Sequence, residues 1–233
     1  MKKKFDENGY VIYHNKIPNE LIKIVQNITL TARYKIINQN LKGNKREYGG
    51  KIYWDGLEMA STEYPELFEL YTSDLMYEIA EELLETNEIY LFNDQIVTKL
   101  PNDGFTFPLH CDNGLGPNPD LASKGYYKSI TCCWVLDDFT KFNGPITLLN
   151  KKTNLEETIY PKIGDIAVWD GETQHYSNEN TSNSPRRVWL QIYTNKNITI
   201  IPSNSNFSGY YKQRFIKGKT INEIKNKTIK TIL

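Results

Sequence analysis

The chain has 233 residues, of which 39% are hydrophobic and 24% charged, a composition that allows a packed core and argues against a disordered protein. Its 28 Lys and Arg residues balance its 28 Asp and Glu residues, so charge gives no reason to expect nucleic acid as a partner. The three cysteines are odd in number and two are adjacent, so no disulfide framework is implied, and the lack of a CxxC pair argues against a thiolate zinc site. Without a secretory signal or a run of about 20 apolar residues, we expect a cytoplasmic protein with no membrane contact.

Helical patterns occupy the first part of the chain. A short strand is predicted at residues 9–13, and a helix is predicted to begin at Pro18, because apolar residues at helical spacing follow it. Residues 40–57 are rich in Gly, Lys and Asn and predict a loop. A second helical stretch is predicted over about residues 64–86. Together these segments form a helical support over about residues 15–87.

Short strands replace the helices from residue 88 onward. They are predicted at residues 89–100, 129–136, 146–149, 158–160, 165–169 and 187–193, with turns such as Asn143-Gly144-Pro145 between them. This pattern is typical of an all-β sandwich or barrel. We therefore predict one domain over residues 1–233 that is mainly β with N-terminal helices. Its β-core spans about residues 88–201, and a basic, partly helical C-terminal extension spans 202–233.

Two of the three histidines are placed to meet one carboxylate at a single cation. His110 and Asp112 form a His-X-Asp pair, and side chains at i and i+2 of a strand point to the same face. His175 follows a predicted turn, strand and turn at residues 164–171. Two histidines and one carboxylate form the facial triad of non-haem Fe(II) oxygenases, which leaves positions open for a co-substrate and O2. A His-X-Asp pair alone is a weak signal, and its alternative is a structural hydrogen-bonded pair.

A candidate anion-binding residue follows the distal histidine. Arg186 lies eleven residues after His175, at the head of the apolar strand predicted at residues 187–193. A dicarboxylate co-substrate needs a buried cation at the end far from the metal, and the planar guanidinium binds a carboxylate through two parallel hydrogen bonds. The alternative is an ordinary surface charge on a strand.

These motifs resemble the phytanoyl-CoA dioxygenase family of Fe(II)- and 2-oxoglutarate-dependent oxygenases. The resemblance extends over about residues 5–194 and is carried by residues 5–12, 99–104, 108–112, 130–138, 143–146, 164–165 and 175–177. It implies a double-stranded β-helix, the cupin-like jelly roll. It also implies a role for each candidate residue: His110, Asp112 and His175 bind iron, Arg186 binds the distal carboxylate of 2-oxoglutarate, Ser177 assists it, and Trp134 forms a wall of the co-substrate pocket. Gln95 and Lys99 share one face of the strand before the metal segment, from which they could reach the co-substrate or the substrate.

The chain departs from the family pattern at two places. Cys111 stands between the metal His and Asp where the family often has Gln, and residues 149–153 replace a Pro-Gly-Ser-His-like turn near the substrate mouth. The second departure means that the substrates of the family do not carry over to this chain. Asp112 is present, which argues against the halogenase variant of the family, in which a small residue replaces the carboxylate.

The resemblance implies a dioxygenase that uses Fe(II), 2-oxoglutarate and O2. We expect it to hydroxylate an unactivated C–H bond of a small soluble metabolite, with release of succinate and CO2. Four loop aromatics are candidates for contact with this substrate: Tyr53, Trp54, Tyr126 and Tyr127. Two alternatives stay open. One is a non-catalytic jelly-roll protein that binds a carbohydrate or another ligand, and the other is a metal hydrolase or isomerase on a similar barrel.

Overall fold

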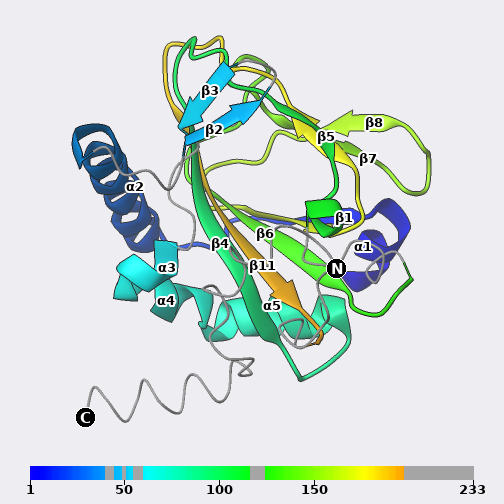
Figure 1. The fold of residues 1–233 in the computed structure, drawn as a ribbon. Coiled ribbons are helices and arrows are strands. Elements are labelled where there is room, and N and C mark those ends of the chain that lie inside the picture. The colour runs from blue at the N-terminus through cyan, green and yellow to red at the C-terminus, as the bar shows by residue number, and fades with distance from the viewer. Residues whose placement is uncertain (40–44, 49–50, 55–59, 116–123, 197–233) are drawn as a thin grey trace, which may run out of the picture.

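Two antiparallel sheets form the centre of the protein (Figure 1). The structure is a computed structural model that describes residues 1–39, 45–48, 51–54, 60–115 and 124–196. The larger sheet has the order β1 (Tyr10–Tyr13), β9 (Ile166–Asp170), β6 (Ser129–Val135), β11 (Arg186–Thr194) and β4 (Tyr90–Lys99). The smaller sheet has the order β5 (Phe107–His110), β10 (His175–Ser177), β7 (Ile146–Leu149) and β8 (Glu156–Thr158). Apolar residues of both sheets pack together between them, including Val97, Val135 and Trp169 from the larger sheet and Ile146 and Leu148 from the smaller one. This two-sheet arrangement is the one that the predicted jelly roll requires.

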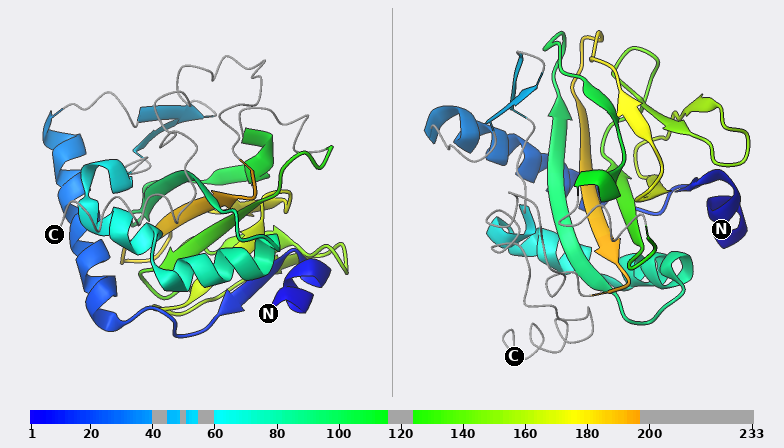
Figure 2. Two further views of the ribbon diagram at one scale, coloured as in Figure 1. Left: turned by 90° about the horizontal axis from the view of Figure 1, so that it is seen from below. Right: turned by 45° about the vertical axis from the view of Figure 1, so that its right-hand side comes forward.

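Helices cover the outer face of the larger sheet (Figure 2). They are α1 (Lys2–Asn8), α2 (Asn19–Gln39), α3 (Ala60–Glu63), α4 (Pro65–Tyr71) and α5 (Asp74–Leu84). A second core cluster joins them to the sheet, with Val25, Leu67 and Met76 on the helices against Trp134 and Trp189 on the strands. The larger sheet is thus buried on both faces, and all seven residues of β6 are buried.

The observed elements differ from the predicted ones in several places, and the strand predicted over 158–160 is observed as β8 at Glu156–Thr158. The single helix predicted over 64–86 is divided into α4 and α5, because Ser73 is extended at φ −65° and ψ 156° and starts a new helix there. The loop predicted over 40–57 contains a hairpin of β2 (Lys45–Tyr48) and β3 (Lys51–Trp54). Residues 2–8 form helix α1, which the sequence did not predict. The predicted C-terminal extension, 202–233, lies outside the described residues, and the division into one domain stays a prediction.

Alternation along the strands decides which side chains face the space between the sheets. On β4 these are Gln95, Val97 and Lys99, and on β11 they are Arg186, Val188 and Leu190. Antiparallel pairing places Arg186 opposite Lys99 and Leu190 opposite Gln95. Two strands of the larger sheet, β4 and β11, therefore present polar side chains to the same interior space as the smaller sheet. Among the described residues, no helix has the length and apolar composition to span a membrane.

Candidate metal centre

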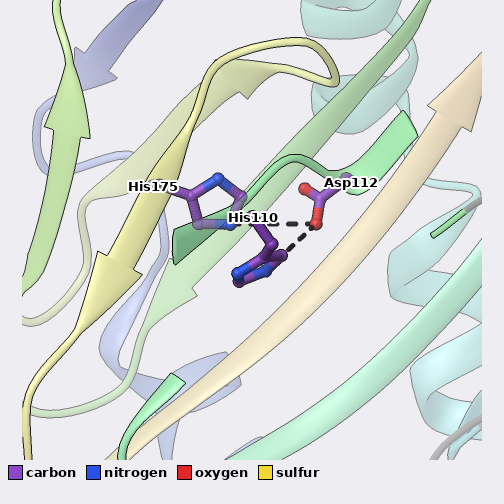
Figure 3. A group of neighbouring side chains, drawn as sticks. All are labelled: His110, Asp112 and His175. Carbon is purple, nitrogen blue, oxygen red and sulfur yellow. Dashed lines mark ion pairs between the residues drawn. The ribbon is translucent and has the colours of Figure 1, made fainter. Parts of the chain in front are cut away.

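The two histidines and the aspartate come together with their side chains directed toward one another (Figure 3). His110 ends β5, His175 begins β10, and the two are register partners in the smaller sheet. Asp112 directs Oδ1 at both imidazoles, 3.9 Å from Nε2 of His110 and 3.8 Å from Nε2 of His175. The three candidate ligand atoms all lie within 4.8 Å of one another. Two imidazole nitrogens and one carboxylate oxygen at this spacing fit a divalent cation such as Fe(II).

Backbone carbonyls fix the tautomer of both histidines. Nδ1 of His110 is 2.7 Å from the carbonyl oxygen of Pro108, and Nδ1 of His175 is 2.9 Å from that of Thr173. A carbonyl can only accept a hydrogen bond, so both Nδ1 atoms carry the proton and both Nε2 lone pairs face Asp112. Burial, together with the neighbouring His175, lowers the pKa of His110, which favours the neutral imidazole that a metal requires.

Asp112 reaches the site from a turn and not from a strand. Strand β5 ends at His110, and Asp112 begins the 3-10 helix η2 (Asp112–Leu115). The next residue, Asn113, donates its backbone N–H to the carbonyl of Gly171 at 2.9 Å and accepts a hydrogen bond from Ser129 Oγ at 2.6 Å. The two side chains therefore meet, but the i and i+2 strand geometry expected from the sequence is wrong. The turn is held by its contacts with the ends of β6 and β9.

Arg186 is a buried cation without a carboxylate partner in the described part of the chain. It is 2% exposed, and its Nη2 donates to the carbonyl of Gly144 at 2.9 Å. Its Nε has no hydrogen-bond partner among the described residues. Burial lowers the pKa of Arg186 to about 10, so the group stays charged at neutral pH. The neighbouring Arg187 differs, because it forms a two-pronged ion pair with Asp137 at 2.8 and 2.7 Å.

A cavity of about 190 Å³ contains the three candidate metal ligands and Arg186 in its wall. Gln95 and Ser177 also line it, in agreement with their predicted positions. The rest of the wall is mostly apolar and includes Phe105, Phe107, Pro108, Ile146, Trp169, Val188 and Leu190. The structure thus brings six of the eight predicted residues to one cavity.

The other two predicted residues lie away from the cavity wall. Trp134 is on the outer face of β6, where its Nε1 donates to the sulfur of Met76 at 3.2 Å. This corrects the expectation that Trp134 walls the co-substrate pocket; the tryptophan in the wall is Trp169. Lys99 faces inward, but its Nζ donates to the carbonyls of Phe105 and Ser177 at 3.2 and 3.1 Å and also to that of Asn178. Lys99 was expected to reach the co-substrate or the substrate, but in the structure its Nζ contacts backbone carbonyls instead.

Among the described residues, Tyr126, Tyr127 and Cys111 do not line the cavity. Tyr126 is 43% exposed and Tyr127 is buried, and neither is part of the wall. The side chains of Tyr53 and Trp54 lie outside the described residues. Cys111 is half-buried and forms no disulfide. The predicted substrate contacts of these aromatics stay untested.

Comparisons with known proteins agree with this architecture. The model of the phytanoyl-CoA dioxygenase (PhyH) family matches residues 5–188. No curated protein matches the chain. Among solved structures, the chain is similar to the non-heme alpha ketoglutarate dependent epimerase SnoN from nogalamycin biosynthesis, with 15% identity over 84% of this chain and 80% of that chain and a TM-score of 0.69. It is also similar to EctD from S. alaskensis with bound Fe, with 16% identity, 82% and 74% coverage and a TM-score of 0.69. A third similar structure is the non-heme alpha ketoglutarate dependent carbocyclase SnoK, with 16% identity, 84% and 83% coverage and a TM-score of 0.68. At these identities the likeness shows the fold, and it confirms the predicted double-stranded β-helix.

Proposed function

The chain belongs to the phytanoyl-CoA dioxygenase family of Fe(II)- and 2-oxoglutarate-dependent oxygenases, and we propose that it hydroxylates a C–H bond of a small molecule. In this reaction one atom of O2 enters the C–H bond of the substrate and the other enters succinate, as 2-oxoglutarate loses CO2. Iron and 2-oxoglutarate supply the oxidising chemistry when bound. The protein supplies binding, orientation and exclusion of water.

The observation that carries this proposal is a buried guanidinium, without a carboxylate partner among the described residues, in the same cavity as three metal-ligand atoms. A buried cation is costly without an anion, and a buried N–H donor is costly without an acceptor. A carboxylate placed against Arg186 supplies both. 2-Oxoglutarate fits this demand, because its keto-acid end suits the metal and its second carboxylate suits Arg186. Ser177, in the same wall, is positioned to add a hydroxyl donor to that carboxylate.

The cavity wall also supports a substrate class. Among the described lining residues, Asp112 and Arg186 are the only ones outside the histidines that carry a formal charge, and both have a proposed partner. Most of the remaining wall is apolar, with the amide of Gln95 among its polar groups. We infer that the part of the substrate that enters this space is uncharged, as suits reaction at an unactivated C–H bond of a small soluble metabolite.

The fold alone does not select hydroxylation, since an epimerase and a carbocyclase share it. The first experiment is anaerobic addition of Fe(II) and 2-oxoglutarate to the purified protein. We expect a visible charge-transfer band, whereas a folded protein without the band would support a non-catalytic jelly-roll ligand-binding protein. The second is incubation of the loaded protein with candidate small molecules under labelled O2. A product that gains one labelled oxygen, with stoichiometric succinate, supports hydroxylation; turnover without O2 or succinate would instead support a metal hydrolase or isomerase.

A further inference from the structure

The two oxygens of the Asp112 carboxylate have different surroundings. Oδ1 faces Nε2 of both histidines, at 3.9 and 3.8 Å. Oδ2 accepts two hydrogen bonds, one from Thr131 Oγ1 and one from Trp169 Nε1 at 2.8 Å. Oδ1 therefore faces the candidate metal position, whereas Oδ2 is hydrogen-bonded to the protein.

The sheet places both donors at the same point. Thr131 on β6 and Trp169 on β9 are direct partners in the antiparallel ladder. Side chains of such a pair stand roughly 5 Å apart on the same face, so a hydroxyl and an indole N–H can converge on one acceptor. Both residues are 1% exposed, so water does not compete for either donor. Hydrogen bonds to a carboxylate are stronger than those between neutral groups.

Trp169 contacts a second candidate ligand. Its ring centroid lies 5.1 Å from that of His175, with an interplanar angle of 53°. The same side chain therefore restrains the carboxylate through its N–H and the imidazole through its ring. Another tryptophan, Trp134, lies three residues after Thr131 on β6, but it is on the opposite face, where its Nε1 donates to the sulfur of Met76.

We propose that Thr131 and Trp169 are positioning residues that hold Asp112 in a one-oxygen binding mode, an inference that rests on the proposed iron site. Two hydrogen bonds on Oδ2 draw electron density to that oxygen and fix the plane of the carboxylate. Oδ1 alone then remains for the cation. A carboxylate that bound through both oxygens would occupy a position that the facial triad keeps open for co-substrate or O2.

The test uses Co(II) as the probe, in the full-length protein without co-substrate. The dissociation constant for Co(II) and the visible ligand-field spectrum, which reports coordination number, are measured for Thr131→Val and Trp169→Phe. Each variant removes one donor and keeps most of the side-chain volume. We expect each to weaken Co(II) binding by about 10-fold and to shift the spectrum towards higher coordination. Thr131→Ser, which retains the hydroxyl, should restore both properties.

Trp134→Phe is the matched control, because it removes a buried indole N–H from the same strand outside the site. It should leave Co(II) affinity and spectrum unchanged. If the unmodified protein binds Co(II) while Thr131→Val and Trp169→Phe match it in both measurements, the positioning role is refuted and the proposed iron site stands. If the unmodified, folded protein binds no Co(II), the iron site and this inference both fail. Should Thr131→Val not fold, Trp169→Phe decides by the same criteria.

Discussion

Arg186 and Lys99 are register partners across β11 and β4, and both carry their cationic groups into the interior between the sheets. Their surroundings separate their roles. Burial, and then the charge of Arg186, lowers the pKa of Lys99 to about 6, which disfavours the charged form of the lysine. Arg186 keeps its charge, because burial lowers its pKa only to about 10. Nζ of Lys99 is directed at backbone carbonyls, so of the two residues Arg186 is the one that remains available to an anion.

Replacement of Arg186 tests the co-substrate site directly. Arg186→Gln keeps a polar side chain but removes the charge and the fork geometry. We expect the dissociation constant for 2-oxoglutarate to rise by about 10- to 100-fold, the equivalent of roughly 1.5–3 kcal/mol for hydrogen bonds to a charged group. The measurement is titration of the charge-transfer band under anaerobic conditions with Fe(II).

Arg187→Gln is the matched control for this variant. Its guanidinium pairs with Asp137, so its loss should lower stability modestly and leave 2-oxoglutarate affinity unchanged. Equal weakening by both substitutions would mean that Arg186 has no specific role.

The lowered pKa of Lys99 predicts how the free energy of unfolding depends on pH. The pKa of Lys99 is about 6 in the folded protein, and its ordinary value, which applies to the unfolded chain, is 10.5. Between these two pH values the unfolded state binds more protons than the folded state. The free energy of unfolding therefore rises with pH across this window because of Lys99. In Lys99→Met the rise should be smaller, as measured by urea unfolding at several pH values between the two limits. An unchanged pH dependence would show that Lys99 keeps its ordinary pKa in the folded protein.

The alternation along the strands correctly predicted which side chains share a face, but it did not predict which face borders the cavity. The period of two correctly placed Gln95 and Lys99 on one face of β4. On β6 the same period separates Thr131 from Trp134, but helices cover one face of that strand and the second sheet covers the other. Because both faces are apolar and buried, periodicity could not decide which one borders the cavity. The expectation that Trp134 walls the cavity rested on the family resemblance, and periodicity could not test it.

Contacts between residues that are far apart in the sequence could not be predicted. The triad residues and Arg186 could be predicted, because metal-ligand chemistry and the need for a buried cation restrict the residue types. The hydrogen bonds from Thr131 and Trp169 to Asp112 depend on strand register, which no local motif specifies. The carbonyls that accept hydrogen bonds from Lys99 belong to Phe105 and Ser177. Every residue has a backbone carbonyl, so the sequence does not indicate which of them will accept such a bond.

The three histidines of the chain provide an internal comparison for metal binding. His110→Ala and His175→Ala should each abolish the charge-transfer band with Fe(II) and 2-oxoglutarate, because each removes one of three ligands. His14→Ala should retain it, because His14 lies at the surface with a side chain that is 74% exposed and contacts Asp165 instead. Retention of the band in His175→Ala would contradict the proposed metal centre.

Gly171 is predicted to control the turn that carries Asp112. A Cβ at this position would lie 2.0 Å from Ser129 Oγ and 2.6 Å from Asn113 Oδ1, and these two atoms are hydrogen-bonded to each other. Gly171→Ala must therefore break that bond or displace the turn next to Asp112. We expect a loss of about 1–3 kcal/mol in the free energy of unfolding, together with weaker Co(II) binding. The measurements are urea unfolding and Co(II) titration.

Gly125→Ala separates the two effects, because Gly125 has a φ of 72° but no atom within 4 Å of the added Cβ. Its cost of about 1–2 kcal/mol comes from backbone strain alone, and Co(II) affinity should not change. If Gly171→Ala also leaves Co(II) affinity unchanged, the hydrogen bond between Ser129 and Asn113 does not position Asp112. The turn would then be held by the backbone hydrogen bond from Asn113 to Gly171, which an alanine can keep.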